Sequence, residues 1–248
     1  MNKLDGLSRP FEYVIGATSP VQRMIKILKN IANDKPVPKV ATKEAESTSA
    51  LLFVHLLHLL SGTGQLNGAG YHSVAITLFR PLEDALDCFG AVSLVKGAAE
   101  KWMERKLRAS DASKMWIELI EIGNEKVTML EYRKMARECF NQYSHCTPEQ
   151  AHWNLYLKPI GETKCEMELN IMPMVINSNG HTIDAYLVAH LWELIYIVEK
   201  AYEEYLNQHM KLFKEILRLK DEIRIILEEH HKNGCLDVAG ATELKRIK

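Results

Sequence analysis

The stretch YHSVAITLFRPLEDALDCFGAVSLV, residues 71–95, decides the fold class because its apolar residues lie on most faces of a helix. A helix of that kind is surrounded by other helices rather than by water. The segment from about Ala45 to Leu60 has the same character. Two such segments are typical of the centre of a helical bundle. Pro81 has no backbone N–H and is expected to kink the second helix.

Most of the remaining chain also shows helical spacing. Ser19 is suited to be an N-cap, and Pro20 then occupies the first helical position. Thr128 and Glu131 have the spacing of a capping box, which predicts a helix start just after Thr128. The further helices expected are near residues 20–31, 98–108, 111–122 and 129–143.

The last hundred residues predict two further features. Partial alternation of apolar and polar residues in HWNLYLKP and KCEMELNIMPMVI, residues 152–159 and 164–176, predicts a small β-hairpin. From about Ile183 to His231 the apolar spacing is helical throughout, and an unbroken helix would be about 70 Å long. Either it breaks near Asn207, or its far half projects and requires a partner.

The expected fold class is therefore all-α: a multi-helix bundle with a small β-hairpin and a long C-terminal helix. The expected organisation is an N-terminal helix and linker at residues 1–43, a bundle with hairpin at 44–205, and a C-terminal extension and tail at 206–248. A chain of 248 residues can bury a substantial core.

Composition excludes several classes of function. Charged residues make up 25% and hydrophobic residues 47% of the chain, as in globular proteins. The net charge of −1 gives no overall field to attract nucleic acid, so such binding would require a local patch. The most apolar run, residues 49–60, is shorter than the about 20 residues of a membrane span. The first residues lack the apolar core typical of a signal peptide, and there are five cysteines without a CxxC pair, so the expected location is the cytoplasm.

The glycine-rich stretch SGTGQLNGAG, residues 61–70, is expected to be a turn between two helices. Glycine ends helices readily because it adopts positive φ without a steric cost. A phosphate-binding loop would require a preceding strand, and here a helix precedes.

Four charged residues lie in the apolar segment 71–95. Arg80, Glu83, Asp84 and Asp87 stand at i, i+3, i+4 and i+7, so they share one face of the helix. Charges in apolar surroundings are costly unless they are paired or used. Two interpretations remain: an internal ion-pair network that fixes helix docking, or the polar floor of a cleft in which Arg80 binds a phosphate.

A second polar set lies in TMLEYRKMARECFNQYSH, residues 128–145. Its members are Arg133, Arg137, Asn141, Ser144 and His145. A histidine beside an arginine can perform acid–base chemistry on a phosphodiester. The alternative is that His145 only caps the carbonyl groups at the helix end.

Metal binding has weaker support. The Glu-x-x-His unit of di-iron bundles occurs twice, and His55 and His58 lie three residues apart. No full ligand set is visible, so neither a metal nor a cofactor is expected. The two Glu-x-x-His pairs are Glu149 with His152 and Glu228 with His231. A basic stretch at residues 95–108 could contact nucleic acid or form a solvated helix face.

Part of this pattern resembles a known family. Arg80 followed three residues later by Glu83, and a second helix ending in NQYSH before a hairpin and a long helix, resemble an uncharacterised bacterial family near the HEPN superfamily. The resemblance covers roughly residues 45–205. It implies a dimer and, as in many HEPN proteins, a metal-independent ribonuclease of toxin or phage-defence systems. The active site of such ribonucleases pairs an arginine with a histidine, with four to six residues between them.

The spacing in this chain differs, since seven residues separate Arg137 from His145. The catalytic hypothesis implied by the resemblance gives the acid–base role to His145 and phosphate binding to Arg80 and Arg137. Glu83 and Asp87 would orient those arginines, and Asn141, Tyr143 and Ser144 would contact the substrate. The expected partners are then RNA or a nucleotide and a second copy bound through the C-terminal helix, without a membrane. The competing hypothesis is a non-catalytic interaction or scaffold module whose buried charges set helix packing.

Overall fold

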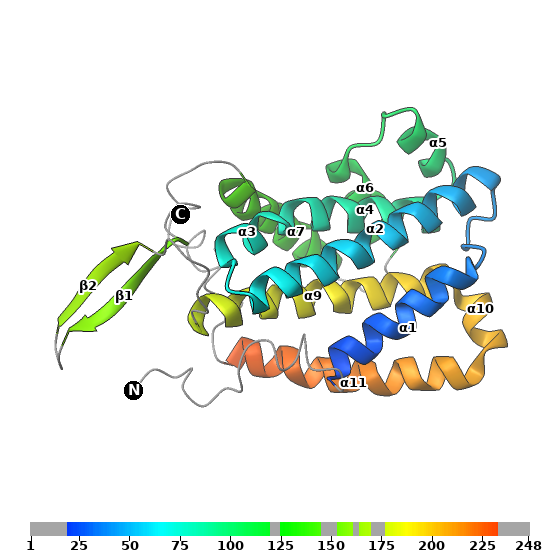
Figure 1. Ribbon diagram of the computed structural model, residues 1–248. Coiled ribbons are helices and arrows are strands. Elements are labelled where there is room, and N and C mark those ends of the chain that lie inside the picture. The colour runs from blue at the N-terminus through cyan, green and yellow to red at the C-terminus, as the bar shows by residue number, and fades with distance from the viewer. Residues whose placement is uncertain (1–18, 120–124, 145–152, 161–163, 170–176, 233–248) are drawn as a thin grey trace.

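The computed structural model describes residues 19–119, 125–144, 153–160, 164–169 and 177–232. Helices fill almost all of these ranges (Figure 1). They are α1 (Pro20–Asp34), α2 (Lys43–Gly68), α3 (His72–Thr77), α4 (Phe79–Leu94), α5 (Ala98–Met103), α6 (Ala109–Ile117), α7 (Glu125–Ser144), α9 (Asn177–Ala201), α10 (Glu203–Gln208) and α11 (Met210–Lys232). Two short strands, β1 (Leu155–Ile160) and β2 (Lys164–Leu169), complete the described structure.

Helices α2, α4 and α9 form the centre of the bundle. For α2 and α4 this central position was predicted from the apolar character of their sequences. Helix α2 packs against α4 and α9, and α4 also packs against α6 and α9. At one end of this centre, Phe53 of α2 stacks on Phe89 of α4 with ring centroids 5.2 Å apart. Tyr202, at the end of α9, closes the same aromatic group.

The predicted start of α1 is confirmed. The Ser19 hydroxyl accepts a hydrogen bond from the backbone N–H of Gln22 at 3.1 Å, and Pro20 is the first helical residue. The predicted interruption near Pro81 is also present, because α3 ends at Thr77 and α4 begins at Phe79. Pro81 has no N–H to donate to the carbonyl of Thr77 four residues earlier, so one continuous helix is not favoured there.

Several helix ends differ from the predicted ones. Helix α7 already begins at Glu125, so Thr128 lies inside it and does not begin the helix. Helix α5 ends at Met103, and Arg105 then adopts a left-handed φ of 58°, which shortens the helix expected over residues 98–108. Helix α6 is likewise confined to Ala109–Ile117.

The prediction of a turn throughout residues 61–70 is wrong. Helix α2 continues to Gly68, and the turn is limited to the next residues, where Gly70 has a φ of 81°. Packing explains the difference, because Thr63, Gly64 and Asn67 are buried against the rest of the bundle. Tertiary contacts here outweigh the low helix propensity of glycine.

The prediction of one long C-terminal helix is also wrong. The chain breaks at Tyr202 and again at His209, and α11 folds back along α9 and α1 (Figure 1). The apolar stripe of α11 is thereby buried within the same chain, through Ile216, Leu219, Ile223 and Ile226. Of the two alternatives left by the sequence, the break near Asn207 is the one observed.

The expected fold class also included a small β-hairpin in the bundle, and this part of the prediction was wrong. Helices account for 84% of the well-defined part of the chain, and no strand contributes to the described bundle. Strands β1 and β2 pair antiparallel with each other, with Leu155 opposite Leu169, and they lie beyond one end of the helices (Figure 1). The all-α class alone is confirmed.

A single apolar core runs through the described helices. It includes Met24 and Leu28 of α1, residues of the central helices, and Ile216 and Ile223 of α11. The three segments expected from the sequence, 1–43, 44–205 and 206–248, therefore all contribute to the same core. This core surrounds a small set of charged side chains, which forms the candidate site.

Candidate functional site: a buried ion-pair network

Arg133 of α7 lies at the centre of the polar network, and its side chain is only 2% exposed. Its Nη1 donates to Oε1 of Glu83 on α4 at 3.2 Å, and its Nε lies 3.6 Å from Oδ1 of Asp87. Its Nη2 donates to Oε2 of Glu193 on α9. One guanidinium group thus connects three helices of the bundle.

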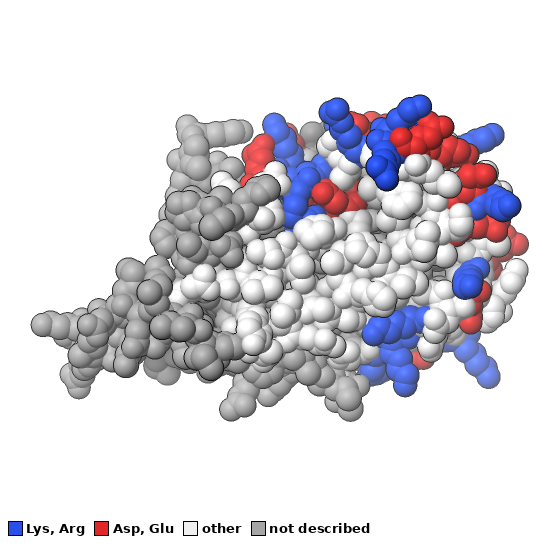
Figure 2. Space-filling view, turned by 45° about the horizontal axis from the view of Figure 1, so that its top comes forward, with Lys and Arg blue, Asp and Glu red and all other residues white. Residues whose placement is uncertain are grey.

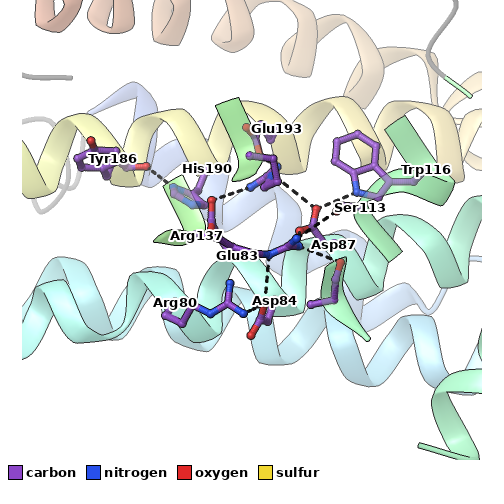
Figure 3. A network of polar contacts seen from close by, with 12 residues as sticks. Arg80, Glu83, Asp84, Asp87, Ser113, Trp116, Arg137, Tyr186, His190 and Glu193 are labelled. Carbon is purple, nitrogen blue, oxygen red and sulfur yellow. Dashed lines mark hydrogen bonds and ion pairs between the residues drawn. The ribbon is translucent and has the colours of Figure 1, made fainter. Parts of the chain in front are cut away.

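Arg137 lies one helical turn further along α7 and connects α4 with α6. Its Nη2 donates to Oδ2 of Asp87 and to the backbone carbonyl of Ala109 at 2.8 Å. The Nε1 of Trp116 donates to the other Asp87 oxygen, Oδ1, at 2.9 Å (Figure 3). Asp87, which is fully buried, therefore accepts hydrogen bonds from two neighbouring helices.

The four charged residues of α4 divide into two rows. Glu83 and Asp87 point into the core, with residue exposures of 1% and 0%. Arg80 and Asp84 pair with each other at 3.1 Å near the surface, where their side chains are 23% and 37% exposed. The shared face predicted from the sequence is therefore split between core and rim (Figure 3).

Burial changes the protonation equilibria of this network. Burial raises the pKa of Glu83 to about 7, although the charge of Arg133 opposes the rise. Burial also raises the pKa of Asp87, against the effect of Arg133 and Arg137. Burial acts to lower the pKa of Arg133, but Asp87, Glu193 and Glu83 together raise it well above its ordinary value. Arg133 therefore stays charged, while Glu83 exchanges its proton near neutral pH.

The contacts of Glu83 agree with a carboxyl group that readily binds a proton. Its Oε1 accepts from Arg133, whereas its Oε2 is buried without a hydrogen-bond partner among the described residues. An ionised carboxylate in that position would leave half of its charge unpaired in apolar surroundings. The protonated form removes this cost.

The sequence-predicted catalytic residues are only partly brought together. Glu83, Asp87 and Arg137 belong to one network, while Arg80 lies at its edge, paired with Asp84. His145 lies outside the described residues. The two buried carboxyl groups accept from arginine and indole donors, and their exposures of 0–1% leave no surface for a polymer to reach.

The predicted substrate contacts lie beyond this network, at the C-terminal end of α7. Asn141 is exposed, and its backbone carbonyl accepts from the Ser144 hydroxyl at 3.2 Å. Tyr143 packs edge-on against Trp153, with ring centroids 5.8 Å apart. Asn141 and Ser144 lie about 6 and 10 Å further along the helix axis than Arg137, at 1.5 Å per residue.

Sequence reasoning missed three members of the network. Arg133 was part of the predicted polar set without a role, whereas the structure makes it the centre. Glu193 and Trp116 were not singled out. Glu193 carried a usable signal, because it is the only charged residue in the apolar run between Asp184 and Glu199. Trp116 carried no such signal in the sequence, because its indole N–H matters only through its hydrogen bond to Asp87, which the fold creates.

A second buried polar group also escaped the sequence analysis. The Nδ2 of Asn67, at the end of α2, donates to Oδ1 of Asp184 at 2.8 Å and to the carbonyl of Gly180 at 3.0 Å. The Oδ1 of Asn67 lies 2.7 Å from Nδ1 of His72. Burial raises the pKa of Asp184 well above its ordinary value and lowers that of His72 to about 4. These buried groups join α2, α3 and α9.

Among the described residues, neither a metal site nor the open pocket coincides with either polar group. Within the described ranges, no three His, Cys, Asp or Glu side chains are placed to hold a metal ion. Glu149 and His152 lie outside those ranges. An open pocket of about 510 Å³ lies instead at the corner of α9 and α10, lined among others by Lys39, Lys200 and Glu204.

Comparison of the chain with known proteins gave no relative. No family model, no curated protein and no solved structure matches it. The similarity to HEPN proteins therefore stays a prediction, and the function has to be argued from the geometry of the chain itself.

Proposed function

We propose that this protein is a non-catalytic helical interaction module. Its buried charges fix the packing of α4, α6, α7 and α9, and its uncharged surface on α2 binds a protein partner. The observation that supports this proposal is the closure of the network around Arg133. The side chains of Glu83 and Arg133 are 1% and 2% exposed and are paired with each other.

A packing role agrees with the way each charge is used. Arg133 and Arg137 contact carboxyl groups on two other helices, so α7 can dock in only one register without leaving a buried charge unpaired. Removing one partner of such a pair is strongly destabilising, whereas catalysis requires that a group remain available to the substrate. Helix register is the property that this network can define.

The surface available for binding is the outer face of α2. We define this face as the exposed positions of α2 after Glu46 together with the residue that follows the helix: Ser47, Leu51, Val54, His55, His58, Gln65 and Ala69. Leu51 is 66% and Val54 40% exposed, and no Asp, Glu, Lys or Arg occurs between Glu46 and Arg80. Nucleic-acid binding depends on Lys and Arg contacts with phosphates. A face without Asp, Glu, Lys or Arg, with exposed Leu51 and Val54, instead favours a protein partner.

RNA cleavage is the rival function, and it is tested by adding fluorescent single-stranded RNA to the purified protein without metal. Two proteins are compared, the wild type and the His145→Ala variant, each with its free energy of unfolding measured in urea. We expect no cleavage by either protein. Cleavage by the wild type that is lost in His145→Ala, with unchanged stability of the variant, would overturn the proposal.

A further inference from the structure

The beginning of α9 and the end of α11 meet through two buried histidines. His181 of α9 is 1% exposed and His230 of α11 is 2% exposed. Their ring centroids lie 6.3 Å apart, with the ring planes at 59° to each other. Figure 1 shows these two helix ends side by side, at the end of the bundle opposite to α10. The two imidazoles therefore face each other in the contact between α9 and α11, away from water.

We propose that His181 and His230 form an acid-sensitive latch. While both imidazoles are neutral, the latch holds the last turns of α11, residues 226–232, on α9, and it releases them when the imidazoles bind protons. Release uncovers Ile226, an apolar side chain that is 6% exposed while the latch is closed. This inference concerns the conformation of the chain and does not depend on the proposed function.

A positive charge is unfavourable at both positions because each imidazole is removed from water. Other charged side chains are hydrated: on the side of the molecule in Figure 2, Lys, Arg, Asp and Glu are gathered toward the edges. Nδ1 of His181 has no hydrogen-bond partner among the described residues. Burial lowers the pKa of His181, and burial together with the charge of His181 lowers the pKa of His230 to about 4. Two protons on this pair would place two like charges in one buried contact, which is costly without counter-charges.

The described residues around the beginning of α9 offer no effective acidic counter-charge. Asp184 lies one turn after His181, and its Oδ1 accepts from Asn67 of α2 at 2.8 Å. Burial raises the pKa of Asp184 well above its ordinary value, so this carboxyl group loses its charge before an acidic pH is reached. On α3, His72 lies against the same asparagine, and burial lowers its pKa to about 4. Neither α2 nor α3 therefore compensates for an imidazolium here.

The charged side chains of the other neighbouring helices are engaged in pairs or exposed to water. The pairs are Arg80–Asp84 and Glu83–Arg133 at α4, Arg23–Glu222 between α1 and α11, and Arg224–Glu228 on α11. Glu229 and Lys232 are exposed at the end of α11. The contact of Arg23 with Glu222 lies about 12 Å before His230 along the helix, at 1.5 Å per residue. Among the described residues, His181 is the charged group that acts on the pKa of His230.

The end of α11 can separate without disrupting the rest of the bundle. Helix α11 packs mainly against α9 and α1, and the Arg23–Glu222 contact with α1 lies before the last turns. Neither the aromatic group around Phe53 nor the ion-pair network around Arg133 includes a residue of α11. Helix ends also open at a lower free energy than the core does. Protonation of the latch is therefore expected to open α11 locally.

The direction of the pH effect follows from the lowered pKa values. A group with a lowered folded pKa contributes stability that is complete above its ordinary pKa and is lost as the pH falls toward the lowered one. For His230 this interval runs from 6.5 down to about 4. Glu83 acts in the opposite direction, because burial raises its pKa and its contribution is complete in acid. The sign of the pH dependence therefore separates the latch from the network.

Hydrogen–deuterium exchange of the full chain at about pH 7 and about pH 4.5 tests the latch, with observed rates divided by the intrinsic rates at each pH. We expect the protection of residues 226–232 to fall at least tenfold at the lower pH. The protection of α4 should change less than threefold. A wild type that keeps the protection of α11 in acid, or that loses it equally in α4, would overturn the proposal.

Replacing both histidines by phenylalanine isolates the pair, because phenylalanine has a ring of similar size that binds no proton. In the double variant His181→Phe/His230→Phe, the protection of α11 at the lower pH should stay within threefold of its value at the higher pH. His58→Phe is the matched control, since His58 is exposed on α2, and it should show the wild-type fall. A double variant that is protected near neutral pH and still opens in acid contradicts the latch, as does a control that no longer opens.

If the double variant lacks protection of α11 at both pH values, the titration of the two histidines in the wild type decides the question. Their NMR signals are assigned by their absence from His181→Phe and from His230→Phe. Both should titrate below about pH 5.5, which is at least a tenfold loss of proton affinity relative to an ordinary histidine. A signal of either residue that titrates above that limit overturns the proposal.

Discussion

Arg133 of α7 and Glu83 of α4 lie 3.2 Å apart, measured from Nη1 to Oε1, with side chains that are only 2% and 1% exposed. Asp87 and Glu193 approach the same guanidinium from α4 and α9. Three acidic groups therefore share one arginine, and Asp87 also pairs with Arg137. Under the proposed function, charges placed in this way make alternative packings of the helices unfavourable.

The first prediction concerns Arg133→Met. The variant should lose about 3–5 kcal/mol of unfolding free energy, because it leaves buried acidic groups without their counter-charge. Arg224→Met is the matched control. Arg224 pairs with Glu228 at 2.8 Å on the surface of α11 and is 52% exposed, so its loss should cost less than about 1 kcal/mol. Urea unfolding of both variants measures the difference, and similar losses would contradict a structural role for Arg133.

The second prediction concerns the pH dependence of stability. The folded pKa of Glu83, about 7, lies above its ordinary value of 4.5 because of burial. A raised pKa means that the contribution of Glu83 to stability is complete below about pH 4.5 and is lost as the pH rises through 7. The loss amounts to roughly 3 kcal/mol at 1.36 kcal/mol per pKa unit.

Glu83→Gln removes this titration. The stability of the variant relative to the wild type should therefore increase between pH 4.5 and pH 8 by roughly 3 kcal/mol. Urea unfolding at several pH values in that interval measures the difference. A difference that stays constant, or that decreases with pH, would show that Glu83 is ionised in the folded protein.

The third prediction concerns the packing of Trp116 on α4. A Cβ atom added at Gly90 would lie 2.9 Å from Cγ of Trp116, whose indole also donates to Asp87. Gly90→Ala should therefore destabilise the protein by about 1–3 kcal/mol, despite the better helix propensity of alanine. Gly62→Ala is the control, because its added methyl group meets open space and should stabilise dilute protein by about 0.5–1 kcal/mol. Equal effects of the two substitutions would contradict the close contact.

The sequence predicted the local features of this fold well. The apolar character of α2 and α4, the Ser19 cap and the interruption before Pro81 all depend on residues within one or two turns of each other. The burial of Glu83 and Asp87 also followed from their place in an apolar helix. Each of these features is determined by the residue types in its own segment.

The partners of those charges could not be predicted from the sequence. Arg133 meets Glu83 across 50 residues and Glu193 across 60, so their pairing depends on how the helices cross. The split of α4 into a buried and a rim row has the same origin, because α7 and α9 cover only one side of the shared face. The return of α11 onto α9 was equally hidden, since its apolar stripe would also have suited a partner chain.

The most direct measurement of the structural role of the network is a double-mutant cycle between Arg133 and Glu83. The variants are Arg133→Met, Glu83→Leu and the double variant, compared by their free energies of unfolding. We predict that the double variant is more stable than Arg133→Met by about 1–3 kcal/mol, because the second substitution removes an acid that the first left unpaired. Losses that add within about 0.5 kcal/mol, or an Arg133→Met variant as stable as the wild type, would contradict the account.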